Sequence, residues 1–180
     1  RQGVRDAVRR TVVTTDRSST PSASVVGADE RRHDDAVDVD VARWVTLAER
    51  VLAAEGAAGE LTLTFVDADD IADINAEHMG ADGPTDVLSF PMDDEPVVGV
   101  PTLLGDVVIS PAVAAGQFSE HAGTLDDELA LLVVHGILHV LGHDHAEPDE
   151  TALMRARELD LLERFHWRGA APSGFRQSHG

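Results

Sequence analysis

The chain has 180 residues, the size of one ordinary domain with tails, and its formal net charge is −19 at pH 7. It contains no cysteine, which excludes a disulfide framework, a disulfide-linked partner and a thiolate metal site. No apolar run is long enough to span a bilayer, and the N-terminal residues lack the apolar segment of a secretory signal. We therefore expect a cytoplasmic protein without a membrane partner.

The charge is unevenly distributed along the chain. Residues 21–150 contain four Arg against 28 acidic residues, whereas residues 1–20 and 151–180 carry five Arg each. An acidic field of this kind repels polyanions. Any contact with nucleic acid must therefore be local and helped by a metal ion.

The first half of the chain alternates strand and helix patterns. Residues 1–20 show little apolar periodicity and are expected to be a flexible extension. Two strands, two amphipathic helices and a further pair of short strands are then predicted, with turns or loops between them. In chain order they are strand 22–28, helix 41–55 ending at Gly56, strand 60–67, a helix capped by Asp67 or Asp69 and reaching His78, strand 86–90 stopped by Pro91, and strand 105–110.

The second half is helical. The patterns predict a helix from Pro111 to about His121, a helix that begins at Thr124 and ends at Leu141, and a helix that begins near Pro148. The fold class is α+β, or mixed α/β, with a small four-stranded sheet packed against about five helices. One domain over residues 21–167 is expected, followed by a flexible tail over 168–180.

A metal-binding pattern lies on the most apolar helix. Residues 129–141 (LALLVVHGILHVL) are apolar on every face except at His135 and His139, so this helix is predicted to be buried in the centre of the domain. His135 and His139 are four residues apart and share one face. Gly142 ends the helix in a left-handed conformation that lets the chain reverse and return His145 to that face.

Three converging imidazoles predict one catalytic Zn²⁺ per chain. Zinc takes tetrahedral nitrogen ligands, and a set of three protein ligands leaves one position for water. His135, His139 and His145 are therefore both the metal ligands and, through a metal-bound water, the catalytic residues. Spacing alone leaves another divalent metal such as Ni²⁺ open, and it leaves open that His135 and His139 are simply buried and hydrogen-bonded.

The same spacing also raises a peptidase as an alternative function. The spacing H-x3-H-x2-G-x2-H matches the metzincin signature except that Gly136 occupies the position of the general-base Glu. A peptidase would therefore have to take its base from outside the motif.

Three ordered segments carry a family resemblance. They are 83–91 (GPTDVLSFP), 104–110 (LGDVVIS) and 135–145 (HGILHVLGHDH). Together they resemble the YbeY family of bacterial metal-dependent endoribonucleases, over about residues 23–166. The resemblance implies a small sheet packed on a central ligand-bearing helix, with the three histidines as metal ligands. It also implies single-strand-specific cleavage of RNA, 16S rRNA 3′-end processing, ribosome maturation and quality control, and partners among single-stranded rRNA and small ribosomal subunit components.

Two positions depart from the family pattern. The family often carries an Arg shortly before its PTDVLSFP segment, where this chain has Met79, and a Tyr where this chain has His143. The arginine's role therefore does not transfer, and His143 is interpreted as a surface residue. A ribosome-assembly factor with a structural metal and no catalysis is the second functional class, which Met79 and the acidic charge favour.

Other polar residues near these motifs have two interpretations each. Asp144 is a candidate to orient a ligand histidine, or else a solvated residue at the helix end. Asp86 and Asp106 are assigned to turn and backbone hydrogen bonding. Thr85 and Ser89 share one face of a strand, which lines either a cleft or plain solvent.

Overall fold

The computed structural model describes residues 22–33, 37–92, 97, 99–120, 123–144 and 146–177. The elements, in chain order, are β1 (Ala23–Asp29), α1 (Val41–Ala54), β2 (Gly59–Phe65), α2 (Ala68–Met79), β3 (Val87–Pro91), β4 (Leu103–Ile109), α3 (Pro111–Gln117), α4 (Leu125–Val140) and α5 (Pro148–Phe165). This is the α+β class expected from the sequence. The predicted extension over 1–20 lies outside the described residues.

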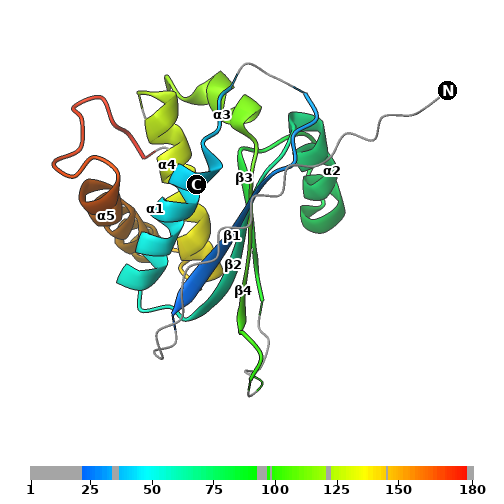
Figure 1. Cartoon of the computed structure of the whole chain (residues 1–180). Coiled ribbons are helices and arrows are strands. Elements are labelled where there is room, and N and C mark those ends of the chain that lie inside the picture. Colours follow the sequence, from blue (N-terminus) through cyan, green and yellow to red (C-terminus); the bar gives the residue numbers. More distant parts are fainter. Residues whose placement is uncertain are drawn as a thin grey trace.

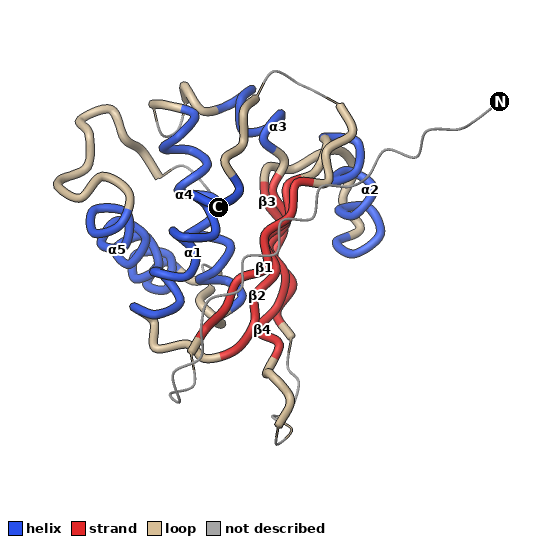
Figure 2. Tube along the Cα trace, viewed as in Figure 1, coloured by secondary structure: helices blue, strands red, loops and turns tan. Residues whose placement is uncertain are grey.

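The sheet has the strand order β1-β2-β4-β3. β1, β2 and β4 are parallel, and β3 pairs antiparallel with β4 at one edge. Figures 1 and 2 show the sheet as one layer, with α1, α4 and α5 on one face and α2 on the other. No helix in the described part of the chain is long and apolar enough to cross a membrane.

Strand alternation separates the two faces. In β2, Leu61, Leu63 and Phe65 are fully buried beneath the three helices, while the threonines between them are partly exposed. On the opposite face Val66, Ile71 and Leu88 form a smaller cluster beside α2. The main core therefore lies between the sheet and α1, α4 and α5, and α4 is its central element.

Most helix ends follow the sequence signals. Thr124 caps α4 by accepting a hydrogen bond from the backbone N–H of Asp127 at 3.1 Å. Glu147 and Glu150 form a capping box at the start of α5, where Pro148 is the first helical residue. These caps fix where the two helices around the candidate site begin.

Two local expectations are corrected. Asp67 is the N-cap residue of α2, but its carboxylate makes no capping bond; it accepts instead from the backbone N–H groups of Arg32 and His33, at 2.8 and 3.4 Å. α3 ends at Gln117, earlier than the expected end at His121, which lies outside the described residues. For Asp67, backbone groups of the segment after β1 bind the carboxylate that the sequence pattern predicted to cap its own helix.

The segment after α5, expected to be a tail, contacts the domain over its described residues. The rings of Trp167 and Phe175 meet edge to face, 4.7 Å apart, and Phe175 packs against the main core. The side-chain amide of Gln177 donates to Glu158 at 2.9 Å. Residues 168–177 therefore cover part of α5.

Candidate metal centre

His135 and His139 point the same ring atom at each other. Their Nε2 atoms are 3.1 Å apart, and their rings are nearly perpendicular, with centroids 4.5 Å apart. His135 is buried and His139 is half-buried, so the pair lies where α4 reaches the surface. The helical spacing of four residues thus produces two nitrogen atoms directed at one small volume.

A surface pocket opens over these two rings. Its volume is about 350 Å³, and besides the two histidines it is lined by Met79, Val87, Leu88, Ser89 and Pro91. Four of these five residues come from β3, which packs against α4 at the sheet edge. The pocket therefore presents two imidazole nitrogens on a wall that is otherwise mainly apolar.

Glu158 holds the other nitrogen of His135. The Nδ1 atom of His135 lies 2.7 Å from Oε1 of Glu158, and both side chains are almost entirely buried. An ionised carboxylate only accepts hydrogen bonds, so Nδ1 is the donor of this contact and Nε2 is the ring nitrogen left facing the pocket. Metal-ligating histidines commonly have this arrangement, with one ring nitrogen toward the metal and the other donating to a carboxylate.

Sequence reasoning missed Glu158, although the sequence contains a signal for it. Along α5 the buried positions are Met154, Glu158, Leu161 and Leu162, which form one helical stripe. A single Glu in an apolar stripe requires a buried partner, because an unpaired buried charge is costly. The sequence does not say that the partner is His135, which lies on another helix.

Gly136 lets α4 approach the sheet closely. A Cβ atom built on Gly136 would lie 2.6 Å from Cγ1 of Val107 and 3.2 Å from Oγ of Ser89. The Ser89 hydroxyl also donates to the carbonyl oxygen of Gly136 at 3.1 Å. The position that holds the general-base Glu in the metzincin pattern therefore has no room for a side chain here.

The end of α4 reverses the chain as expected. Gly142 has a φ of 91°, its N–H donates to the carbonyl of His139, and the N–H of His143 donates to the carbonyl of Leu138. These two bonds form a Schellman motif, in which the residue after the C-cap is left-handed. His145, the third expected ligand, lies outside the described residues, so its place in the centre stays a prediction.

Comparison with known proteins decides the family. The model of the family described as endoribonuclease YbeY matches residues 29–166, which is most of the chain. The chain belongs to the endoribonuclease YbeY family. The resemblance seen in the three sequence segments is thereby confirmed.

Curated relatives agree with this assignment. An endoribonuclease YbeY from Mycolicibacterium gilvum is 42% identical over 146 residues, covering 76% of this chain and 82% of the relative. One from Nocardia farcinica is 47% identical over 117 residues, covering 61% and 63%. One from Salinispora tropica is 43% identical over 145 residues, covering 74% and 92%. These relatives are named as RNA-cleaving enzymes.

The fold also matches a solved structure. The solution structure of TM1509 from Thermotoga maritima superposes with a TM-score of 0.53 at 25% sequence identity. The match covers 81% of this chain and 91% of that one. This likeness supports the four-stranded α+β arrangement.

The two departures from the YbeY pattern have different positions. Met79, which the sequence resemblance aligns with the family's arginine, lines the histidine pocket and is 51% exposed, so a side chain there reaches the site. His143 is only partly exposed, and its Nε2 lies 3.6 Å from Oε2 of Glu55, the residue that follows α1. Asp144 is exposed and directly precedes the undescribed His145, and its role in orienting a ligand stays a prediction.

The remaining polar residues of the YbeY segments are structural or distant. Asp86 accepts from the backbone N–H of Val87 at 2.8 Å, as expected for turn hydrogen bonding. Thr85 donates to the carboxylate of Asp86 at 3.3 Å. Asp106 lines a pocket on the α2 side of the sheet, opposite α4. Of these residues only Ser89 lines the pocket over the histidines.

Proposed function

We propose that this chain is a zinc-dependent, single-strand-specific endoribonuclease that acts in 16S rRNA 3′-end processing and in ribosome maturation and quality control. The observation that carries the proposal is the pair of Nε2 atoms of His135 and His139, 3.1 Å apart at the mouth of a pocket. It occurs in a chain whose curated relatives are named endoribonuclease YbeY. Cytoplasmic single-stranded rRNA and small ribosomal subunit components are the proposed substrate and partners.

The donor set fits zinc. Two nitrogen ligands of a tetrahedral zinc ion, each about 2.0–2.1 Å from the metal, lie about 3.3 Å apart. The separation of 3.1 Å between the two histidines is close to this value. No group of three or more metal-ligating side chains occurs among the described residues. The proposal therefore takes its third ligand from His145.

The chain's own residues prepare the site for hydrolysis. When bound, zinc supplies Lewis-acid chemistry, making a water molecule more acidic and polarising a phosphate oxygen. Glu158 holds the proton on Nδ1 of His135 and fixes the ring, with Gln177 on its other carboxylate oxygen. Met79, Val87 and Leu88 supply the apolar part of the pocket wall beside the two histidines.

The first experiment combines metal content with RNA cleavage. Wild type purified without chelator is expected to hold one zinc ion per chain and to cleave single-stranded rRNA, and His139→Ala is expected to lose both. His143→Ala is the matched control, since that imidazole contacts Glu55 instead of His139. Undiminished cleavage by metal-free His139→Ala would contradict the mechanism.

A non-catalytic assembly factor is the second candidate. Met79 leaves the pocket without the family's cation, which is the observation that favours it. A stoichiometric metal with no metal-dependent cleavage would support this candidate. A peptidase gains no support, because position 136 has no space for the missing Glu.

A further inference from the structure

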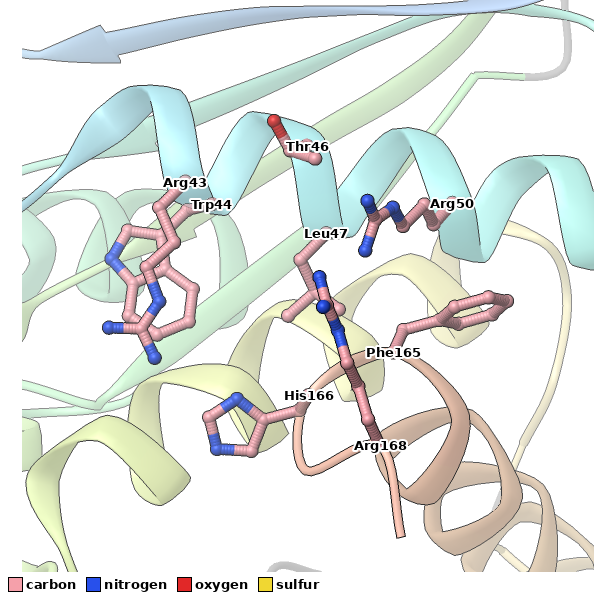
Figure 3. Close-up of a pocket in the computed structure, with 8 residues that line it drawn as sticks. All are labelled: Arg43, Trp44, Thr46, Leu47, Arg50, Phe165, His166 and Arg168. Atoms are coloured by element: carbon pink, nitrogen blue, oxygen red, sulfur yellow. The ribbon is translucent and has the colours of Figure 1, made fainter.

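A second pocket lies between α1 and the end of α5, and neither His135 nor His139 lines it. Its volume is about 290 Å³, and it is lined by Arg43, Trp44, Thr46, Leu47, Arg50, Phe165, His166 and Arg168. Figure 3 shows Arg50 on α1 and Arg168 in the segment after α5 reaching toward each other. Three guanidinium groups thus gather in a chain with a net charge of −19.

Within the described part of the chain, only Arg43 among these arginines has an acidic partner. Arg43 donates to Asp126 at 2.8 Å and lies over the ring of Trp44, 4.5 Å from its centroid. Arg50 and Arg168 have no ion pair or side-chain hydrogen bond with any residue that the structure describes. Two like charges directed at one cavity repel each other unless an anion separates them.

The backbone holds Arg168 in an unfavourable conformation. Its φ is 56°, and within the described residues it is the one non-glycine residue with a positive φ. The left-handed region suits Gly, yet here Gly169 follows and an Arg occupies the strained position. Strain of this kind persists only where the surrounding structure holds it, here through the hydrogen bonds of His166, Trp167 and the N–H of Gly169.

The base of the pocket is fixed by a buried carboxylate. Asp127, at the start of α4, accepts from Nε2 of His166 at 2.8 Å and from Nε1 of Trp167 at 2.7 Å. These bonds anchor the residues immediately before Arg168. On the α1 side, Arg43 and Arg50 are seven residues apart and lie on one face of the helix. Arg50 is thus displayed by a helix, and Arg168 by the anchored segment that follows α5.

We propose that the Arg50–Arg168 pocket binds a backbone phosphate of single-stranded RNA, outside the nucleotides that are cleaved; this rests on the proposed function. Guanidinium groups bind phosphate oxygens through paired, charge-assisted hydrogen bonds. The pocket adjoins the start of α4 through the Arg43–Asp126 and His166–Asp127 contacts, and eight residues of helix, roughly 12 Å, separate Asp127 from His135. It supplies the local positive charge that an acidic chain needs to hold RNA.

The test is binding of a fluorescent single-stranded RNA over a range of salt concentrations. A His139→Ala background prevents cleavage, and Arg50→Gln, Arg168→Gln and their combination are compared in it. The double variant is expected to bind about tenfold more weakly at low salt, and its slope of log K against log salt should fall by about 0.7 for one lost phosphate contact. Arg155→Gln with Arg176→Gln is the control, with the same charge change outside the pocket. Equal weakening by the control pair would overturn the proposal.

A second variant separates binding from folding. Arg168→Gly relieves the positive φ and is expected to raise the melting temperature while weakening RNA binding as much as Arg168→Gln. Unchanged RNA affinity in this more stable variant overturns the proposal. The proposal also fails if inorganic phosphate changes the fluorescence of the pocket-lining Trp44 while the RNA affinity stays unchanged in the Arg50 and Arg168 variants. An acidic peptide that displaces RNA from the pocket at equal concentration also overturns it.

The two proposals fail differently. RNA binding that depends on Arg50 and Arg168, without cleavage by wild type, contradicts the proposed function and supports the pocket. Cleavage and RNA binding that are unchanged in the Arg50 and Arg168 variants contradict the pocket proposal alone. Absence of any RNA binding by wild type overturns both.

Discussion

The Nδ1 atom of His135 and the Oε1 atom of Glu158 lie 2.7 Å apart, with both side chains almost entirely buried. The carboxylate comes from α5 and the imidazole from α4, so their contact depends on how the two helices pack. This pair fixes which nitrogen of His135 faces the pocket. Its removal is the most direct test of how the centre is built.

Glu158→Gln is expected to weaken zinc binding by about 10- to 100-fold, because the neutral amide no longer fixes the ring and tautomer of His135 as strongly. The measurement is a zinc competition titration against a chromophoric chelator. Glu163→Gln is the matched control, since that carboxylate on the same helix accepts from the backbone N–H of Ala171 at 3.1 Å. Equal zinc affinities of Glu158→Gln and wild type would remove Glu158 from the centre.

Gly136→Ala is expected to destabilise the fold by up to about 2 kcal/mol. The helix gains about 1 kcal/mol from Ala, but overpacking against Val107 costs about 1–3 kcal/mol. The new Cβ would lie 2.6 Å from Cγ1 of Val107. Denaturant unfolding measures the change, and adding Val107→Ala should recover part of the steric loss.

The control for that substitution is Gly116→Ala in α3. A Cβ built on Gly116 meets nothing within 4 Å, so only the helix preference acts. Its free energy of unfolding should rise by up to about 1 kcal/mol. A stabilised Gly136→Ala variant would show that α4 and β4 separate more easily than the structure indicates.

The ionisation of Asp127 makes the free energy of unfolding depend on pH in the acid range. Burial alone raises its pKa, but hydrogen bonds from Thr124, His166 and Trp167 outweigh burial, and the pKa lies below its usual range. The stabilisation is therefore complete above the unfolded-state pKa of about 3.9 and is lost as the pH falls through the lower folded-state pKa. Asp127→Asn should cost about 1–3 kcal/mol at pH 7.

The cost of Asp127→Asn should shrink as the pH falls through the folded-state pKa of Asp127, since the wild-type carboxylate is then protonated as well. Unfolding by denaturant at a series of pH values measures both proteins. Asp126→Asn, whose exposed carboxylate pairs with Arg43 alone among the described residues, should show little pH-dependent difference. If Asp127→Asn lowered the free energy of unfolding equally at every pH, the role of Asp127 would depend on the shape of its side chain and not on its charge.

Met79→Arg tests the cation that the family pattern places at the pocket. Met79 is 51% exposed beside the histidines, so an Arg there can reach a phosphate near the centre. If the chain acts on RNA, affinity should rise a few fold at low salt, and the slope of log K against log salt should steepen by about 0.7. Leu153→Arg, at a position 71% exposed on α5, adds the same charge away from the pocket. Equal gains from both would mean that net charge, not position, sets the affinity.

Local features of the fold could be predicted from the sequence. Alternation in residues 59–65 and the helical period in 41–54 are set by backbone geometry, so β2 and α1 lie close to the expected places. The same period puts His135 and His139 on one face, and Gly142 ends α4 in the expected left-handed turn. These inferences depend only on neighbours within a few residues.

The tertiary structure decides which side chains of different elements contact each other. Glu158 meets His135 from another helix, Ser89 binds the carbonyl of Gly136 from a strand, and Arg168 faces Arg50 across a pocket. The sequence pattern predicts that Asp67 or Asp69 caps α2, but the carboxylate of Asp67 accepts from the backbone N–H of His33 instead. Periodicity determines which face of an element is buried, but not which side chain of another element lies opposite. That choice is made by the packing of α1, α4 and α5 on the sheet, because it alone brings these distant residues together.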